Sequence, residues 1–256
     1  MFDLTRITKS GLVRHVDYHA SLGSTSDRAL ELATRDELPL PLLVLSERQT
    51  GGRGRGTNRW WSAAGALTFS LVLEATALPA DARSRVALVA GLAVCEALEQ
   101  LVPRAQWHVK WPNDVYASSG KICGILCESA PGYSERLIVG IGINVNNSAA
   151  RGQGSAPAGA VALIDLDPLP RELTEVLLAV LDRFDLRWSE LLEGRFGELA
   201  SAYRQRCLLT GKTVTVTSGE QRLVGQCRGI DDRGALVLAT ENGTRTIVAG
   251  SIDAWE

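Results

Sequence analysis

Hydrophobic residues recur at helical spacing in several parts of the chain. The first periodic stretch follows Ser24 and Asp27, which are spaced like the two residues of a helix-capping box. The other stretches are longer, and Pro103 ends one of them. The predicted helices cover residues 26–35, 84–101, 172–192 and 196–207.

Short apolar runs between the helices predict strands. The predicted strands cover residues 42–45, 66–73, 107–110, 121–129 and 136–143. We expect a hairpin to bring the strand that begins at Lys121 beside the strand that ends at Lys110. The order of strands and helices fits an α+β fold with a mixed sheet flanked by helices better than alternating βα units.

The pattern changes near residue 209. Short β-rich runs follow, separated by turns such as Asn242-Gly243, and predict a small β-barrel. These runs are residues 213–217, 223–229, 235–239 and 245–248. We therefore predict two domains, 1–208 and 209–256, and a loop or linker of small residues at 148–160.

Composition and charge narrow the class of protein. The 256 residues include 27 Lys and Arg and 29 Asp and Glu, so the net charge of −2 argues against broad nucleic-acid binding. The N-terminus lacks the apolar core of a signal peptide, and the longest apolar run, 86–95, is about half of a membrane span. We expect a cytoplasmic protein without a membrane segment, whose five cysteines are reduced thiols.

Two segments carry candidate binding chemistry. In 49–56, Gly alternates with Arg, which combines a flexible backbone with guanidinium groups suited to phosphate or carboxylate. A solvated basic loop or an RNA-binding segment would explain this run equally well. In Lys-Trp-Pro-Asn-Asp at 110–114, a cation stands beside oxygen ligands suited to Mg²⁺ or ribose. A surface β-turn is the alternative there.

Two further segments place glycine or lysine on strands. Lys121 begins the run Lys-Ile-Cys-Gly-Ile-Leu at 121–126. In Gly-Ile-Gly-Ile-Asn at 140–144, alternating glycines leave one face of a strand without side chains, where a flat ligand can lie on the backbone. Close packing of this strand against a helix is the alternative.

In this order and at these spacings, the four segments resemble the biotin protein ligase family, in its short monofunctional type. Ser-Thr-Ser at 24–26 and the stretch 225–238 add to the resemblance, which thus covers nearly the whole chain. It implies a class II synthetase-like catalytic domain followed by a small SH3-like β-barrel. It also implies an enzyme that uses ATP and Mg²⁺ to activate biotin as biotinyl-5'-AMP. The biotin would then pass to a lysine of a biotin carboxyl carrier protein, of acetyl-CoA carboxylase or a related carboxylase.

The resemblance also assigns roles to individual residues. It implies a catalytic set of Lys110, Arg53 and Arg55, in which Lys110 bridges the biotin carboxylate and the α-phosphate. It implies biotin contacts from Ser24, Thr25, Ser26, Gln49, Arg53, Gly54, Arg55, Lys110 and Gly124. It implies ATP contacts from Arg55, Trp60, Asn113, Asp114, Lys121, Asn144 and Arg228. No resident metal site is assigned, although Asp114 could face the Mg²⁺ of Mg-ATP.

The chain departs from the family pattern at Ser26, where the first motif usually ends in Asn. It starts about twenty residues before that motif, which leaves no room for the DNA-binding helix-turn-helix of some members. We therefore expect no DNA binding and no repressor function, whereas the fold allows for a homodimer. Two other functions stay open, a lipoate or octanoate ligase of the same superfamily and a non-catalytic nucleic-acid-binding module.

Overall fold

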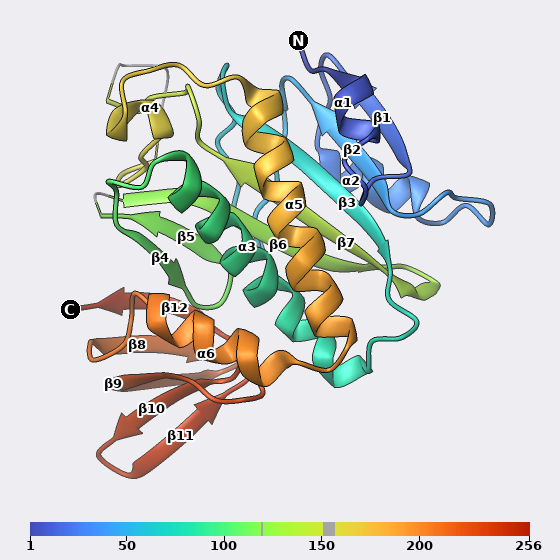
Figure 1. Cartoon of the computed structure of the whole chain (residues 1–256). Coiled ribbons are helices and arrows are strands. Elements are labelled where there is room, and N and C mark those ends of the chain that lie inside the picture. The colour runs from blue at the N-terminus through green and yellow to red at the C-terminus, as the bar shows by residue number, and fades with distance from the viewer. Residues whose placement is uncertain (119, 151–156) are drawn as a thin grey trace.

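A mixed β-sheet forms the centre of the larger part of the molecule (Figure 1). The computed structural model describes residues 1–118, 120–150 and 157–256. In these residues the sheet has the strand order β1-β2-β3-β7-β6-β5-β4, with β1 and β2 parallel and the other neighbours antiparallel. The strands are β1 (His15–His19), β2 (Leu42–Ser46), β3 (Leu67–Glu74), β4 (Trp107–Lys110), β5 (Asp114–Ala117), β6 (Gly120–Ala130) and β7 (Tyr133–Ile143). The predicted mixed sheet is confirmed.

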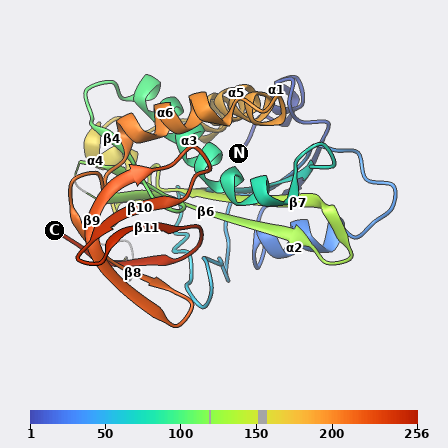
Figure 2. The same cartoon turned by 90° about the horizontal axis from the view of Figure 1, so that it is seen from below.

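Helices cover the two faces of this sheet unequally. Figure 2 shows α3, α5 and α6 together on one face and α2 on the other. The helices are α1 (Leu4–Thr8), α2 (Thr25–Leu32), α3 (Val86–Leu101), α4 (Leu163–Leu166), α5 (Leu173–Leu192) and α6 (Phe196–Arg206), with a 3₁₀ turn at Ala80–Arg85. The Ser24 side chain caps α2 by accepting a hydrogen bond from the Asp27 backbone, as its position in the sequence predicts. The described residues contain no helix with the length and hydropathy needed to cross a membrane.

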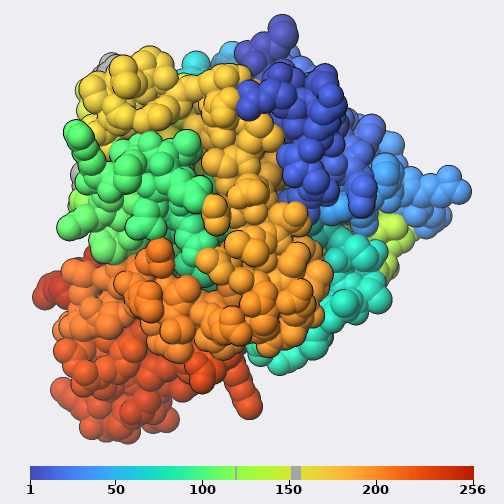
Figure 3. Space-filling view, in the orientation of Figure 1, coloured from blue at the N-terminus to red at the C-terminus, as the bar shows by residue number. Residues whose placement is uncertain are grey.

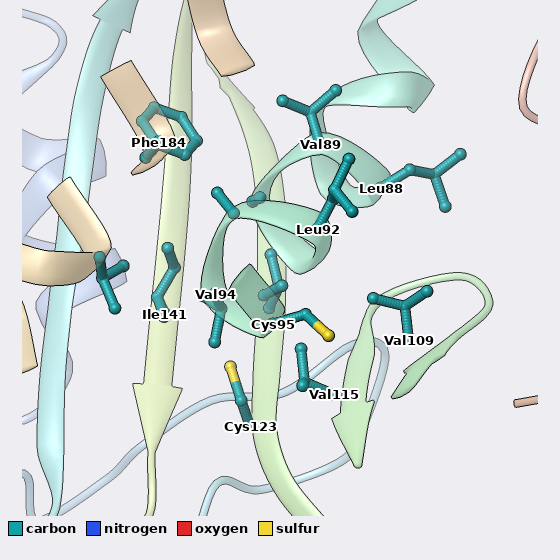
Figure 4. Packing of buried hydrophobic residues seen from close by; sticks show 14 of the residues in the cluster. Leu88, Val89, Leu92, Val94, Cys95, Val109, Val115, Cys123, Ile141 and Phe184 are labelled. Atoms are coloured by element: carbon teal, nitrogen blue, oxygen red, sulfur yellow. The ribbon is translucent and has the colours of Figure 1, made fainter. Parts of the chain in front are cut away.

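The alternation of side chains along β7 separates the core from the opposite face of the sheet. Ile141 is buried in the core beside α3 (Figure 4), and Val139 and Ile143 belong to the same buried cluster. Gly140 and Gly142 therefore point to the face that carries α2, since successive residues of a strand face opposite sides. Burial on the α3 side fixes the register, so the glycine face is specified by the hydrophobic pattern.

A second, antiparallel sheet is formed by the C-terminal residues, with the order β11-β10-β9-β8-β12. Its strands are β8 (Thr213–Ser218), β9 (Gln221–Ile230), β10 (Leu236–Thr240), β11 (Gly243–Ile247) and β12 (Ser251–Trp255). In the space-filling view this sheet forms a lobe below α6 (Figure 3). The Trp111 indole donates a hydrogen bond to the Gly234 carbonyl, 3.3 Å away, which ties the lobe to the larger sheet. The domain boundary at 208 stays a prediction.

Three strands lie where the sequence predicted none, namely β1, β5 and β12. β5 has four residues directly after the Pro-Asn turn, and β1 and β12 combine polar and apolar residues without a buried run. The expected pairing of the strands that carry Lys110 and Lys121 is wrong, because β5 lies between β4 and β6. Part of the predicted loop 148–160, residues 151–156, lies outside the described residues.

Candidate active site

A cavity of about 580 Å³ lies over β6 and β7. It is bounded by α2, the loop in which Gly alternates with Arg at 49–56 (the Gly-Arg loop) and the C-terminal strand β12. Fourteen of the predicted site residues line it, from separate parts of the chain. They are Ser24, Thr25, Ser26, Gln49, Arg53, Gly54, Arg55, Trp60, Lys110, Asn113, Asp114, Lys121, Gly124 and Asn144. The fold thus brings the motifs of the sequence together in one place.

The floor of the cavity is a pair of glycine strands covered by an indole. A Cβ added to Gly142 would lie 2.3 Å from the Trp60 ring, and one added to Gly124 would lie 3.0 Å from it. The flat group on this glycine face is therefore Trp60 of the chain itself, where a ligand was expected. The indole nitrogen is buried and has no hydrogen-bond partner among the described residues. A buried N–H without a partner is costly, so it is available as a donor to a ligand.

One end of the cavity is a network of buried hydroxyl and amide groups. The Gln49 side-chain carbonyl accepts hydrogen bonds from the Thr25 backbone at 2.7 Å and from the Thr25 hydroxyl at 3.1 Å. Ser70 of β3 donates to the Thr25 hydroxyl at 2.9 Å and lies 3.2 Å from the Ser26 hydroxyl. The Ser26 oxygen also sits 2.4 Å from the position of a Cβ on Gly140. The residue at the departure from the family pattern is thus part of the network.

The other end of the cavity is basic. The Asp114 carboxylate lies 2.6 Å from the Lys121 ammonium and 3.7 Å from the Lys110 ammonium. The Lys110 side chain is 8% exposed, whereas that of Lys121 is 36% exposed. Burial lowers the pKa of Lys110, and the neighbouring Lys121 adds to that effect, while Asp114 opposes it. One carboxylate is therefore shared by two ammonium groups, and the cluster keeps a net positive charge.

The Gly-Arg loop folds back on itself beside this cluster. The backbone of Trp60 donates to the Gly52 carbonyl at 3.0 Å, which closes the loop as a narrow hairpin. The Arg53 guanidinium pairs with Glu128 of β6 at 2.6 Å and with Asp27 of α2 at 2.7 Å. Arg55 donates to the backbone carbonyl of Gly250, just before β12. Both arginines are thus fixed by partners within the chain.

Two models of known families match the chain. The model described as the biotin/lipoate A/B protein ligase family matches residues 18–146, and the one described as the biotin protein ligase C-terminal domain matches residues 209–255. The chain belongs to the biotin protein ligase family. The second match covers the lobe of β8–β12, so both sheets correspond to parts of the family.

Similar proteins match over nearly their whole length. The biotin–[acetyl-CoA-carboxylase] ligase of Mycobacterium tuberculosis is 34% identical over 247 residues, which cover 94% of this chain and 88% of that protein. The ligase of the same name from Paracoccus denitrificans is 32% identical, with 91% of this chain and 98% of that protein covered. The solved structure of the biotin protein ligase from Aquifex aeolicus in complex with biotin and ATP has a TM-score of 0.81 and 30% identity, with coverages of 95% and 99%.

Several residues that the family resemblance assigns to ligands have structural partners in this chain. The Asn113 amide donates to the Ile125 carbonyl at 2.6 Å. The Asn144 amide donates to the Val161 carbonyl at 3.1 Å and accepts a hydrogen bond from Asn147 at 2.9 Å. These two asparagines hold neighbouring segments in place at the wall of the cavity.

The residues that the small lobe contributes to the cavity do not include the predicted Arg228. Arg228 is exposed on β9 and is not among the lining residues. Ser251, Ile252 and Trp255 of β12 line the cavity instead. Sequence reasoning missed them because it predicted no strand after residue 248. Tyr116, which also lines the cavity, could have been found from its position two residues after Asp114 on a strand, since both then share one face.

The described acidic residues show no cluster of metal ligands. Within residues 1–118, 120–150 and 157–256, no group of three or more His, Cys, Asp or Glu side chains could hold a metal ion. Both oxygens of Asp114 face ammonium groups, which compete with a cation.

Proposed function

We propose that this protein activates biotin with Mg-ATP as biotinyl-5'-AMP and then transfers the biotin to a lysine of a biotin carboxyl carrier protein. Membership of the biotin protein ligase family supports biotin ligation in general. The adenylate, the residue roles and the carrier protein are the finer parts of this proposal.

One observation carries the proposal: a single cavity joins a hydrogen-bonding end, an indole-covered floor and a basic end. Biotin has matching parts, a polar ureido ring, an apolar chain and a terminal carboxylate. The network of Thr25 and Gln49 suits the ring, whose polar groups need buried partners. The ammonium groups around Asp114 suit the carboxylate and the α-phosphate of ATP.

The first step joins two anions, so positive charge must bring them together and stabilise the charge that develops. The carboxylate oxygen attacks the α-phosphorus, and pyrophosphate leaves. We assign the direct contact to Lys121, because its ammonium is the more exposed of the two. Lys110, for which the sequence predicts the central role, lies deeper and supports the cluster from behind Asp114. Lys110 stays in the proposed catalytic set, and Lys121, expected from the sequence only as an ATP contact, joins it.

The second step is attack of the carrier's lysine amine on the biotinyl carbonyl, with AMP leaving. Water would destroy the mixed anhydride before this happens, so the site must exclude it. The Gly-Arg loop is suited to this because Arg53 and Arg55 connect it to β6, α2 and the lobe. Replacing either arginine should release biotinyl-AMP and label proteins indiscriminately. A variant that loses activity without leaking the adenylate would refute this role.

Two alternatives are less well supported. A lipoate or octanoate ligase would share the match at 18–146, but the biotin-specific description of the match at 209–255 favours biotin. A nucleic-acid-binding module would need free arginines on the Gly-Arg loop. Arg53 is instead paired with two carboxylates, and Arg55 with a backbone carbonyl.

The experiment is a two-stage assay. The protein is incubated with Mg-ATP and labelled biotin, separated from free biotin, and then mixed with a biotin carboxyl carrier domain. We expect bound biotinyl-AMP after the first stage and a labelled carrier after the second, with no label on a carrier whose acceptor lysine is replaced by arginine. A bound adenylate without transfer would limit the proposal to activation, and no adenylate would refute it.

A further inference from the structure

The C-terminal strand places an aromatic ring on one of the two lysines of the site. The centroid of the Trp255 indole lies 4.6 Å from the Lys110 ammonium, within the range of a cation–π interaction. Tyr116 of β5 faces the same ammonium, with its ring centroid 5.9 Å away. Trp255 belongs to the small lobe, whereas both other residues belong to the large sheet.

Trp255 is fixed in this position from several sides. Its ring meets the Tyr116 ring edge to face, with the centroids 6.0 Å apart and the planes at 90°. Its backbone pairs with Val214 of β8, and reciprocal hydrogen bonds between Thr213 and Glu256 hold the following residue. The hydrogen bond from Arg55 to the carbonyl at 250 ties the start of β12 to the Gly-Arg loop. The indole is therefore a built part of the site.

The surroundings of Lys110 explain why an aromatic face is useful there. The charged groups around its ammonium are Asp114, Lys121 and Arg55, and the first of these is already closely paired with Lys121. The Tyr116 hydroxyl stays neutral, since burial raises its pKa to about 12. Tyr203 of α6 is buried in the core, and this burial raises the pKa of its hydroxyl well above the ordinary value. The π face of Trp255 thus attracts the Lys110 ammonium in addition to the one carboxylate that Lys110 shares with Lys121.

We propose that Trp255 is a positioning residue for adenylation, which acts through Lys110 by keeping its ammonium group charged and directed at Asp114. The kinetic part of this inference rests on the proposed function. It makes the small lobe a contributor to the chemical step. It also distinguishes the two lysines, because Lys121 has no aromatic ring over it among the described residues.

The test compares Trp255→Leu with Trp255→Phe. Leucine keeps apolar cover over the ammonium but removes the π face, whereas phenylalanine keeps a weaker face. The first readout needs no activity: the pKa of Lys110 in the ligand-free protein, followed by NMR with ¹³C-labelled lysine and assigned with Lys110→Arg. Trp255→Leu should lower this pKa by about 0.5–1 unit, and Trp255→Phe by less.

The second readout is biotin-dependent exchange of labelled pyrophosphate into ATP as a function of pH. In Trp255→Leu, kcat should fall about 3- to 30-fold, with the alkaline limb of its pH profile moved to lower pH. Trp255→Phe should recover most of the loss, and the KM values should change less than kcat. Val216→Ala, on the strand β8 that pairs with β12, is the control for a general disturbance of β12, because Val216 is buried and does not line the cavity. It should leave the pKa of Lys110 unchanged.

Three results would overturn the inference. One is an unchanged Lys110 pKa in Trp255→Leu, and another is an equal pKa shift in Val216→Ala. The third is a loss confined to the KM of ATP, which would make Trp255 a nucleotide contact. If the wild-type protein shows no exchange with biotin, the proposed function fails, whereas the NMR titration still decides the role of Trp255.

Discussion

Replacing Asp114 by Asn tests whether one carboxylate balances both ammonium groups of the site. The substitution preserves the shape of the side chain and removes its charge. Lys121, being partly exposed, can turn toward water. Lys110 is 8% exposed and has no such escape, so it should respond by losing its proton.

The size of the effect follows from the distance. Two unit charges at 3.7 Å interact by about 4.5 kcal/mol in an effective dielectric of about 20. Loss of this attraction lowers the pKa of Lys110 further, in the same direction as the lowering that burial already causes. Breaking a buried pair by removing one partner typically costs roughly 3–5 kcal/mol of the free energy of unfolding. We expect a loss in this range in neutral solution.

The loss should depend on pH in one direction. The pKa of Lys110 in the folded variant lies below its unfolded value, so the unfolded state binds more protons and the folded state gains stability as pH rises. The difference in melting temperature between wild type and Asp114→Asn should therefore be large at about pH 6 and smaller at about pH 9. Thermal unfolding followed by circular dichroism measures it.

A second substitution provides the matched control. Adding Lys110→Met to Asp114→Asn removes the unpaired charge while keeping an unbranched apolar chain, so it should restore most of the lost stability. A deficit in Asp114→Asn that is the same across this pH range, or that Lys110→Met fails to repair, would refute the reasoning.

Three other predictions follow from the site and its surroundings. Lys121→Ala should slow formation of biotinyl-AMP on the order of 100- to 1000-fold and also raise the KM of a substrate. Lys110→Ala should lower kcat alone. If both variants changed KM equally, the assigned contacts would be contradicted. The hydrogen bond from Cys227 lowers the pKa of Cys207 to about 6. Iodoacetamide at neutral pH should therefore alkylate Cys207 before the cysteines of the large sheet, and mass spectrometry of the peptides would reveal any other order. Gly142→Ala would place a methyl carbon 2.3 Å from the indole that covers it, so urea denaturation should show a loss of about 1–3 kcal/mol, and unchanged stability would contradict this packing.

Local patterns in the sequence predict much of the fold and of the site. The alternation of Ile and Gly at 140–144 predicts a strand with one bare face, and the structure places that face on the cavity. The spacing of Ser24 and Asp27 predicts the start of α2. Both features depend on residues close together in the chain, which is why the sequence alone suffices for them.

Contacts between distant segments could not be predicted in this way. Trp60 covers Gly142, and Trp255 covers Lys110, because loops and strands far apart in sequence meet over β6. β12 is a short edge strand with few buried residues, so its pattern carries no clear signal. The partners of Arg53 likewise come from two other elements, and nothing in the Gly-Arg run indicates them.

The exchange of labelled pyrophosphate into ATP, measured separately with biotin, lipoate and octanoate, tests the central claim most directly. It reports the activation step without a carrier protein. The proposed function predicts exchange with biotin and none with the other two acids. Exchange with lipoate or octanoate but not with biotin would contradict the proposed substrate, and no exchange with any acid would contradict the proposed reaction.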